Sequence, residues 1–532
     1  MNSPRPTLPT PSDNERTPLI DSLLEFIQWQ MERMADLEDE IQSLKKETKK
    51  PRFKSSDMDK ETEKGDAGHT TDKGPPPEKK PRVRRKKKAT LPVHDEQIIK
   101  PEVIPTGSRF KGYRDVIVQD LIITPHNRRY RLAQYVTPEG TYVTGQLPNG
   151  IRGGHWGSTL HSYILYQYHH QHVTQPLLLE QLHDFGVDIS SGQLSNMLTE
   201  KLEGFHDEKD AILQAGLQQA RYIHTDDTGA RHAGETGYCT HIGNELFAWF
   251  KSTESKSRIN FLELLHQEKQ PLCLVNAGAL DYMARQKLPL YVLARLETAD
   301  FGGGDKATLL EWLVKQDITG SRHQKIITEG ALIGGLLSRG IPTDIAVISD
   351  DAGQFNVFDH ALCWIHTERL IHRLIPLNDQ HKAAVEWVRS QVWAIYRDLK
   401  AYKKSPDDQQ KKRIRDDFRY LFQTRTTYET LNQLLKRIGK NEHELLRVLD
   451  RPELPLHNNL SERDIRDYVK KRKISGSTRS ENGRRCRDTF ASLKKTCRKH
   501  RLSFWAFLKD RTSGHNIIPP MAELIRKAAC GL

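Results

Sequence analysis

The sequence predicts a mixed α/β fold over about residues 216–510, with strands first and long helices after them. Three strand-like runs, rich in β-branched and aromatic residues, occupy residues 221–226, 236–253 and 343–351. The second run is divided by Gly243-Asn244, a signal typical of a hairpin between two strands. Helix-like stretches predominate from residue 358 onward. A sheet flanked by helices is the arrangement in which such elements bury their apolar faces on each other.

Charge and cysteine content narrow the class of protein. The 532 residues include 82 Lys and Arg against 69 Asp and Glu, and the net charge of +13 suits an anionic partner, most often nucleic acid. The six cysteines form no Cys-x-x-Cys pair, so we expect a reduced protein without a disulfide framework. No apolar run approaches the ~20 residues that span a membrane, and the N-terminus lacks the core of a signal peptide. We therefore expect a cytoplasmic protein that contacts no membrane.

The first hundred residues predict a helix followed by a linker. Residues 20–44 carry apolar side chains at heptad spacing. Residues 1–48 are therefore expected to form either a short coiled coil or one amphipathic helix packed on its own chain. Residues 49–105 have few apolar side chains and are expected to be a disordered linker. Its basic tract, residues 79–88, predicts phosphate contacts, although a merely solvated linker has the same composition.

Two small units are expected between the linker and the α/β domain. Residues 106–152 contain β-branched and aromatic runs split by Pro and Gly, which predict an antiparallel sheet of three or four strands. Residues 153–215 are helical, with a turn at Gly186 and with Ser190 or Ser191 as the cap of the next helix. This spacing fits a DNA-binding helix-turn-helix and fits a plain helical hairpin equally well.

Acidic residues stand at the ends of two predicted strands and at the start of a helix. Asp226 ends the first strand-like run, Asp350 ends the third, and Glu462 opens a helix. Carboxylates from separate elements provide the oxygen ligands that Mg²⁺ prefers, and two such ions catalyse in-line phosphoryl transfer. Each acid also has an ordinary structural explanation. Residues 226–229, Asp-Asp-Thr-Gly, are typical of a turn, and Asn459-x-x-Glu462 has the form of an N-capping box.

Two further interpretations of the acidic and cysteine-containing segments are weaker. Asp227-Thr228-Gly229 resembles the loop of aspartic peptidases, but those enzymes need two such loops and the chain has no second copy. A zinc site is an interpretation of one cysteine and its neighbouring histidines: Cys363, His360, His366 and His372. A structural zinc ion needs four closed ligands, and a helix face packed below the second Asp explains the same pattern.

A strongly basic segment lies near the end of the α/β domain. Residues 463–501 hold 15 Lys or Arg against 4 Asp or Glu, with aromatic residues among the charges. This composition fits a surface that follows a phosphate backbone, and a solvated charged face is the plain alternative. Together with the basic tract, the segment contains the predicted DNA-binding residues: Arg84, Arg85, Lys470, Lys471, Arg472, Lys473, Arg484 and Arg485.

Three blocks of the sequence resemble the catalytic blocks of the insertion-sequence-66 family of bacterial transposases. They are HTDDTG at 224–229, SDDAGQF with CWIHTERLIHRL within 349–374, and LHNNLSERDIR with KKRKISGSTRSENGRR within 456–485. The similarity covers about residues 155–510, and the Asn-Asn-x-x-Glu-Arg block is its most specific part. It implies a DDE enzyme with an RNase H-like fold, with Asp226, Asp350 and Glu462 as catalytic and metal-binding residues and two Mg²⁺ ions, or Mn²⁺, as cofactors.

The chain follows the family plan with some departures. The family usually has Glu at the position of Asp227, which we therefore expect to be a neighbour of the site and not a ligand. The family's cysteine-pair zinc knuckle is missing, because residues 106–150 contain no cysteine. The two catalytic Asp residues are far apart in sequence, which we attribute to an insertion at about residues 262–335. Residues 511–532 are expected to form a C-terminal tail.

The resemblance implies a DNA transposase. Such an enzyme cleaves phosphodiester bonds at transposon ends and joins the freed 3′-hydroxyl to target DNA. The expected partners are terminal inverted repeats, target DNA, further copies of the chain in a homo-oligomer and accessory proteins of the same element, in association with a bacterial nucleoid. The alternative is a non-catalytic DNA-binding or accessory protein derived from a transposase.

Overall fold

Five strands form the central sheet of the computed structural model, which describes residues 27, 30, 92–148, 151, 155–342 and 344–531. The strands are β3 (Tyr222–Gly229), β4 (Tyr238–Gly243), β5 (Ala248–Thr253), β6 (Ala346–Ser349) and β7 (Asp359–Leu362). They lie in the order β5-β4-β3-β6-β7, with antiparallel pairing from β5 to β3 and parallel pairing from β3 to β7. A mixed sheet of this order, flanked by helices, is consistent with the RNase H-like core expected from the sequence.

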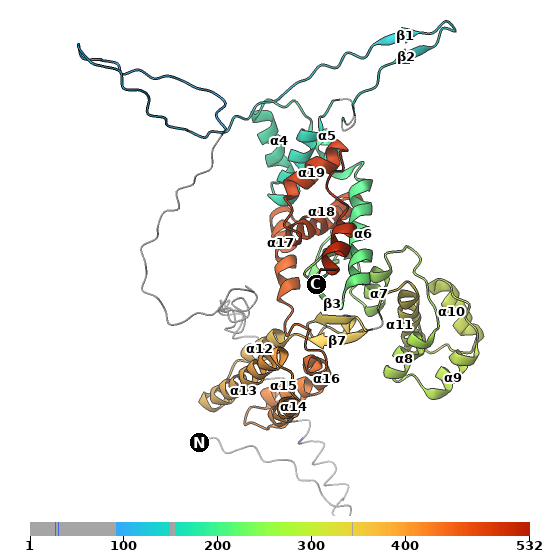
Figure 1. Cartoon of the computed structure of the whole chain (residues 1–532). Coiled ribbons are helices and arrows are strands. Elements are labelled where there is room, and N and C mark those ends of the chain that lie inside the picture. The colour runs from blue at the N-terminus through green and yellow to red at the C-terminus, as the bar shows by residue number, and fades with distance from the viewer. Residues whose placement is uncertain are drawn as a thin grey trace, which may run out of the picture.

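Helix α18 (Glu481–Lys499) covers the edge of the sheet at β5 (Figure 1). Three outward N–H groups of the strand donate to side chains of α18: Ala248 to Thr496 (3.2 Å), Phe250 to Ser492 (2.9 Å) and Ser252 to Asp488 (2.7 Å). Two strand residues advance about 6.6 Å and four helical residues about 6 Å, so side chains four apart on the helix match alternate strand residues. The helix thereby satisfies donors that an open sheet edge leaves unpaired.

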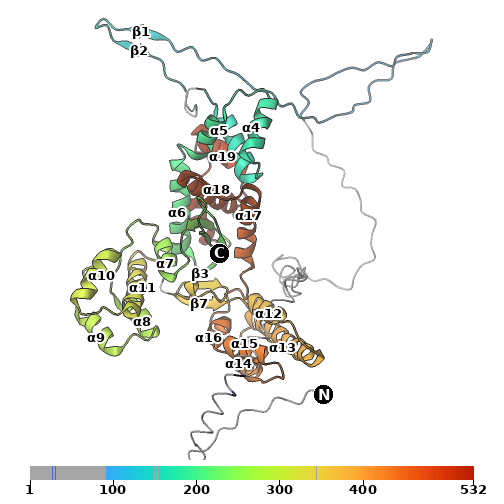
Figure 2. The ribbon, with the colours of Figure 1, turned by 180° about the vertical axis from the view of Figure 1, so that it is seen from behind.

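The helices before and after the sheet pack together into one body. Those before it are α3 (Ser158–Leu165), the π-helix η1 (Tyr166–His170), α4 (Gln175–Asp184), α5 (Ser191–Thr199) and α6 (Glu203–Gln219). Those at the end of the chain are α17 (Asn459–Ser475), α18, α19 (Phe504–Ser513) and α20 (Met521–Ala529). Helix α3 contacts α19, and α6 contacts α20, so segments from both halves of the chain lie side by side (Figure 2). The segment expected as a C-terminal tail therefore contains a packed helix, with Met521 and Ile525 buried.

The helical pair predicted before the sheet is present as α4 and α5. Gly186 lies between them with φ +80°, a conformation that favours glycine. Ser190 caps α5: its Oγ accepts from the N–H of Gln193 (3.3 Å), and Gln193 Oε1 accepts from the N–H of Ser190 (2.9 Å). The predicted turn and cap are confirmed, while the entry of α5 into a DNA groove stays a prediction.

Two helical lobes interrupt the sheet-forming sequence. The first joins β5 to β6 and contains α7 (Arg258–His266), α8 (Ala277–Arg285), α9 (Leu290–Thr298), α10 (Lys306–Lys315) and α11 (Ser321–Ser338). The second follows β7 and contains α12 (Trp364–His372), α13 (Asp379–Lys404), α14 (Asp408–Gln423), α15 (Glu429–Gly439) and α16 (Glu442–Leu445), around an apolar cluster of its own. Figure 1 shows the two lobes standing apart from each other beside the sheet. Along the sequence, the second lobe lies between β7 and α17, although α17 itself packs on β3 and β4.

Local structure differs from the sequence prediction in two places. The sequence predicts helix from residue 358, but the structure has strand β7 at Asp359–Leu362, because this short buried run pairs with β6. Periodicity alone does not distinguish a short apolar strand from a helix. Within residues 106–148 the structure has one hairpin, β1 (Gln134–Val136) with β2 (Tyr142–Thr144), where three or four strands are predicted. The other apolar side chains of that segment are exposed and have no sheet face on which to pack.

Several N-terminal predictions lie outside the described residues. The heptad segment 20–44, apart from Ile27 and Gln30, and the basic tract 79–88 with Arg84 and Arg85 belong to this group. Across the part of the chain that the structure describes, no helix combines the length and apolar character needed to cross a membrane.

Candidate active site

The parallel pairing of β3 with β6 brings Asp226 and Asp350 side by side. The register pairs His224 with Ile348, and each Asp lies two residues further along. Neighbouring strands are about 4.8 Å apart, so residues that continue this register lie close together. Asp350 directly follows β6, whereas β3 continues past Asp226 to Gly229 along β4. Asp226 therefore lies within a strand, at the point where the parallel ladder ends, and not in a turn.

The neighbouring carboxylate, Asp227, has its own hydrogen-bond partners. Its two oxygens accept from the hydroxyl of Thr240 (2.5 Å) and from the side-chain amide of Gln354 (3.0 Å). Asp226 Oδ1 accepts only from the N–H of Asp227 (2.8 Å) among the hydrogen bonds of the described residues. Successive side chains of a strand point to opposite faces, so Asp226 and Asp227 lie on opposite faces of the sheet. This arrangement supports the expectation that Asp227 is a neighbour of the site.

Asn458 ties the start of α17 to the strand that carries Asp226. Three hydrogen bonds join this fully buried residue to other elements: Nδ2 donates to the carbonyl of Thr225 (2.8 Å), Oδ1 accepts from His224 Nδ1 (2.9 Å), and its N–H donates to Cys363 Sγ (3.2 Å). Its carbonyl accepts from the N–H of Glu462 (3.2 Å) in the first turn of α17. Burial lowers the pKa of His224 to about 3, so the ring is neutral at physiological pH. Sequence reasoning did not single out Asn458; the Asn458-Asn459 doublet was the available signal.

A second buried contact holds α17 against β4. His241, which pairs with Asp226 across the antiparallel ladder, places Nδ1 2.6 Å from Ser461 Oγ and Nε2 3.4 Å from Asp464. Ser461 and Asp464 are both buried. Because Glu462 directly follows Ser461, this contact and that of Asn458 place Glu462 near Asp226 and Asp350, where the parallel pairing of β3 and β6 ends.

The N-capping explanation of Glu462 is wrong. Helix α17 begins at Asn459, its N-cap residue is Asn458, and no side-chain capping hydrogen bond forms. The carboxylate of Glu462 instead accepts from Arg369 Nη1 (2.9 Å) and Nη2 (3.4 Å) and lies 3.5 Å from His366 Nε2. Both partners come from α12, so tertiary contacts and not the helix terminus orient this carboxylate.

The pKa values show that the acids interact. Burial, followed by repulsion from Asp350, raises the pKa of Asp226 to about 7, and Glu462 contributes in the same direction. For His366, burial acts to lower the pKa, but the Cys363 sulfur, Glu462 and Asp350 outweigh it and raise the pKa to about 9. The site therefore combines mutually repelling carboxylates with a protonated imidazole on the side of α12.

The donor set suits a hard divalent cation in chemistry, although the carboxylates are not gathered around one point. Among the described residues, no group of three or more His, Cys, Asp or Glu side chains lies close enough together to hold a metal ion. Glu462 is turned to Arg369 instead. Oxygen ligands are what Mg²⁺ prefers, and a cation would relieve the repulsion that raises the pKa of Asp226. Metal binding by all three acids requires Glu462 to leave its arginine.

The zinc interpretation of the same region is not supported. His360 contacts the hydroxyl of Ser349 (2.8 Å), Cys363 accepts from the N–H of Asn458, and His366 faces Glu462. His372 lies 4.0 Å from Glu368. Cys363 and His366 also interact with each other, but His360 and His372 have other partners, and no three such ligands gather within the described residues.

A cleft of about 380 Å³ opens beside Asp350. Helix α12 forms one wall, and α15 and α16 form another. Its polar lining includes Asp350, His366, Arg369, Arg373, Arg437 and Asn441. Three arginines next to a candidate catalytic Asp suit a ligand with phosphate groups, because guanidinium groups bind phosphate in a bidentate manner.

The predicted DNA-binding residues of α17 and α18 differ in exposure. Lys470, Lys473 and Arg485 are exposed, as expected for phosphate contacts. Arg472 donates to Thr228 Oγ1 (3.2 Å) and to the carbonyl of Gly229 at the end of β3. Arg484 pairs with Glu481 (2.7 Å), and Lys471 is buried.

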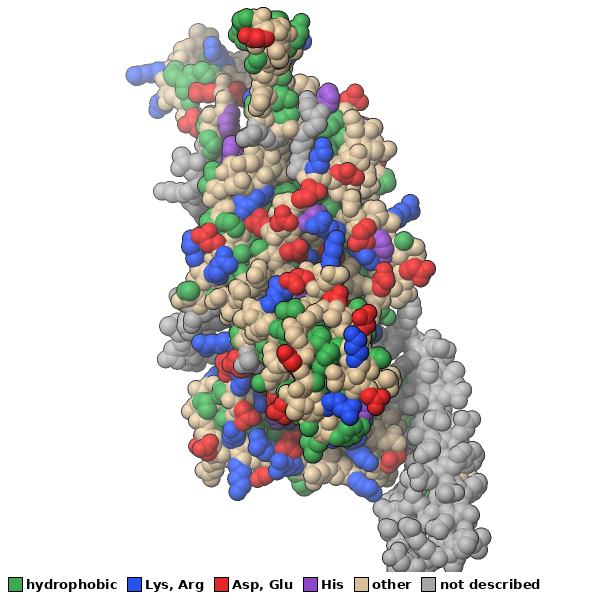
Figure 3. All heavy atoms as spheres, turned by 90° about the vertical axis from the view of Figure 1, so that its right-hand side faces the viewer, with side chains coloured by type: hydrophobic (Ala, Val, Ile, Leu, Met, Phe, Trp, Pro, Cys, Tyr) green, Lys and Arg blue, Asp and Glu red, His purple; other side chains and the backbone are tan. Residues whose placement is uncertain are grey.

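The basic segment 463–501 is therefore not one continuous surface. Part of its charge lies inside, because α18 packs on β5 along much of its length; Lys494 and Lys495 are buried. Acidic and basic side chains are mixed on the face that Figure 3 shows, which carries the lobe α7–α11. The exposed cations of α17 include Lys470 and Lys473.

Comparison with known proteins matches the region that contains the candidate active site. The family model described as "Transposase IS66 family" matches residues 153–269 and 346–485. These ranges contain Asp226, Asp350 and Glu462, and the unmatched residues 270–345 overlap the insertion expected from the sequence. "Uncharacterized protein y4jO" of Sinorhizobium fredii (strain NBRC 101917 / NGR234) is 42% identical over 322 residues, which make up 60% of this chain and 100% of that protein.

Proposed function

Because the chain belongs to the IS66 family of transposases, we propose that it is a DDE-type enzyme that cleaves phosphodiester bonds at transposon ends and joins the freed 3′-hydroxyl to target DNA. The observation that carries the proposal is that β3, the end of β6 and the start of α17 bring Asp226, Asp350 and Glu462 into one region, in which burial and the two other acids raise the pKa of Asp226. All three residues lie within the family match. An acid with a raised pKa, such as Asp226, near a cleft lined by arginines is typical of a functional site. The same proposal includes a homo-oligomer and accessory proteins of the element.

Asp226, Asp350 and Glu462 would hold two Mg²⁺ ions, or Mn²⁺. When bound, such ions make a water or a 3′-hydroxyl more acidic and stabilise the leaving 3′-oxygen. Carboxylates suit this task because they are anionic oxygen donors that leave positions for water and phosphate oxygens.

The other residues of the site bind and orient the DNA. Once Glu462 turns toward the metal, Arg369 and His366 are positive charges available to the scissile phosphate. Arg373 and Arg437 line the cleft beside Asp350 and bind neighbouring phosphates. Asn458 keeps the start of α17 beside β3, so it is a positioning residue.

The test is metal-dependent cleavage of DNA carrying the element's own ends. Asp226→Asn, Asp350→Asn and Glu462→Gln should each abolish cleavage and joining while the protein stays folded and binds duplex DNA. Double substitutions should add little, because members of one catalytic unit are non-additive. Glu429→Gln is a matched control, since Glu429 also lies in the first turn of a helix but far from the acids in sequence.

Two results would contradict the proposal. Near-normal cleavage by folded Glu462→Gln protein would remove the third acid from the catalytic set. Wild-type protein that binds its ends but cleaves them with neither Mg²⁺ nor Mn²⁺, in the presence of the element's accessory proteins, would support the non-catalytic alternative.

A further inference from the structure

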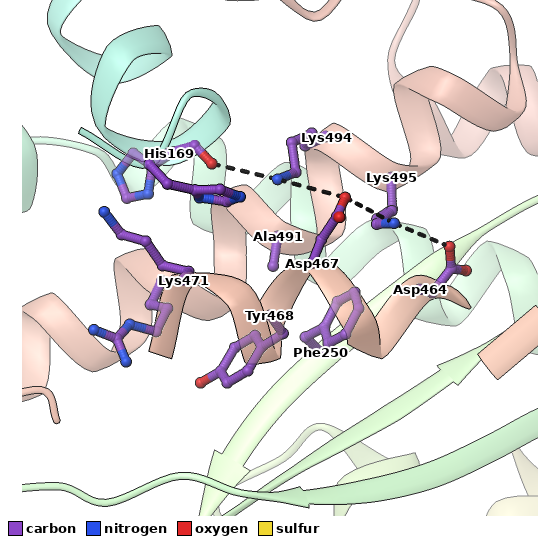
Figure 4. A pocket seen from close by; sticks show the side chains of 11 residues that line it. His169, Phe250, Asp464, Asp467, Tyr468, Lys471, Ala491, Lys494 and Lys495 are labelled. Atoms are coloured by element: carbon purple, nitrogen blue, oxygen red, sulfur yellow. Dashed lines mark hydrogen bonds and ion pairs between the residues drawn. The ribbon is translucent and has the colours of Figure 1, made fainter. Parts of the chain in front are cut away.

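Figure 4 shows a pocket lined by Lys471, Lys494 and Lys495, all of them buried. It lies on the side of α17 opposite to Glu462. Lys471 follows Glu462 by nine residues on α17, which is two and a half helical turns, so the two side chains leave the helix on opposite faces, about 14 Å apart along its axis. Residues of η1, α17 and α18 form the walls of the pocket. The pocket is therefore separate from the candidate active site.

Two cations of the pocket have no carboxylate partner. Lys471 is 5% exposed; its Nζ donates to the carbonyl of Tyr168 (2.8 Å) and lies 3.5 Å from the centre of the Tyr168 ring. Arg487 is 8% exposed, and its Nη1 donates to the carbonyl of Gly476 (3.1 Å). Within the described residues, neither side chain forms an ion pair. Buried charges are normally paired, so this arrangement needs an explanation.

Lys209 shows what a paired buried lysine looks like in the same protein. It is 4% exposed and lies 4.2 Å from the centre of the Trp249 ring, much as Lys471 lies over Tyr168. Unlike Lys471, it has a carboxylate, Asp210, at 3.3 Å. The two lysines are alike in burial and ring contact, so Lys471 differs from Lys209 in having no carboxylate partner among the described residues.

The carboxylates that line the pocket are already engaged by other cations. Four cationic side chains, Lys471, Arg487, Lys494 and Lys495, face only two carboxylates, Asp464 and Asp467. Asp467 pairs with Lys495 (2.9 Å), and Asp464 pairs with Lys499 (2.9 Å) from outside the lining. Positive charge is therefore left uncompensated in a site with little access to water.

The histidines near the pocket also indicate that a hydrogen-bonding partner is missing there. His169 is 7% exposed, and its Nε2 has no hydrogen-bond partner among the described residues. It belongs to the π-helix η1, and His172 just beyond has φ +64°, which is rare for a residue other than glycine. Both backbone features are enriched at functional sites. Burial, reinforced by Arg487 and Lys494, lowers the pKa of Lys471 to about 7, a change that a bound anion would reverse.

We propose that this pocket binds one phosphate group through Lys471, Arg487 and His169, at a site distinct from the scissile phosphodiester. Its cavity of about 20 Å³ has room for little more than one water-sized atom, so a phosphate oxygen enters while the rest of the group stays at the mouth. A base or a sugar is too large. The phosphate belongs either to the DNA backbone or to a free phosphate ion, and the chemistry of recognition is the same.

Thermal unfolding of the full chain in inorganic phosphate and in chloride, at matched ionic strength, tests the pocket. Phosphate should raise the midpoint of the wild type by about 1–3 °C, because a ligand that binds only the folded state stabilises it. Lys471→Met should lose this rise. Lys209→Met, the matched control, should lower the midpoint in both salts but keep the rise. Arg487→Met removes a second positive charge from the pocket and should also lose the rise in phosphate, so the test does not depend on one variant.

DNA binding distinguishes the two sources of phosphate. If a backbone phosphate occupies the pocket, Lys471→Met reduces the magnitude of the salt slope of duplex binding by about 1, whereas Lys209→Met does not. If free phosphate is the ligand, the slope is unchanged and calorimetry with inorganic phosphate shows a site that the Lys471→Met protein lacks and the Lys209→Met protein keeps. Equal midpoints of the wild type in both salts, or an equal rise in the Lys471→Met and Lys209→Met proteins, would overturn the proposal.

The inference does not depend on the cleavage chemistry. The Glu462→Gln protein should keep the full phosphate response, since Glu462 lies on the other face of α17. A loss of cleavage and a loss of the phosphate response therefore report on different sites.

Discussion

Replacing Asp226 by Asn is expected to stabilise the metal-free protein while it removes a carboxylate that we propose to be catalytic. Asp226 is largely buried beside Asp350, and its pKa is raised from 3.8 to about 7. Below pH 3.8 the acid is protonated in both the folded and the unfolded states. As the pH rises toward 7, the unfolded chain ionises while the folded protein retains the proton, so the free energy of unfolding falls.

The size of the effect follows from the difference between the two pKa values. A difference of about three pH units, at about 1.4 kcal/mol per unit, corresponds to at most about 4 kcal/mol at pH 8. Asn is uncharged at every pH and can still accept the hydrogen bond from the N–H of Asp227. The gain of the Asp226→Asn variant should therefore be small near pH 4 and reach its full size by about pH 7–8.

Chemical unfolding in the presence of a chelator, at pH 4, 6 and 8, measures this gain. Asp227→Asn is the matched control, because Asp227 is the adjacent carboxylate and both of its oxygens accept hydrogen bonds. An amide nitrogen in place of one oxygen loses one of these bonds, so that variant should gain less stability or lose some. A gain for Asp226→Asn that is absent at pH 8, or equal at pH 4 and pH 8, would refute the electrostatic account.

Four further outcomes are expected. Mg²⁺ should raise the unfolding midpoint of the wild type but not that of Asp226→Asn, as measured by thermal unfolding with and without the ion. Asn458→Ala should lower the free energy of unfolding by about 2–4 kcal/mol in denaturant titrations, because the buried His224 and the Thr225 carbonyl lose their partner; its cleavage should fall more than its DNA binding. Duplex affinity measured from low to moderate salt should fall with a log–log slope steeper than about −3, and a flat response would contradict the phosphate contacts. Deleting residues 1–50 should reduce the mass in solution if the heptad segment mediates oligomerisation, and an unchanged mass would place the contact elsewhere.

Local signals in the sequence were sufficient for much of the fold. The Gly243-Asn244 dipeptide predicted the hairpin between β4 and β5, and Ser190 predicted the start of α5. These features depend on backbone torsion and on hydrogen bonds that reach three or four residues, which the sequence displays directly. Asp226 and Asp350 were likewise identified by apolar runs that precede them. Strand β7 was not, because its four residues become a strand only by pairing with β6.

The sequence by itself determined which residues are candidates for the chemistry: an acid within one apolar strand, an acid that follows another, a Glu in an Asn-Asn-x-x-Glu-Arg block and an excess of positive charge. Only the tertiary structure decided what those side chains face. Glu462 meets Arg369, 93 residues away, and not its own helix terminus. Lys471 turns inward, because α17 and α18 pack on the sheet with particular faces. The physical reason is that a helix repeats every 3.6 residues whatever it packs against, so the choice of buried face depends on contacts between residues far apart in the chain.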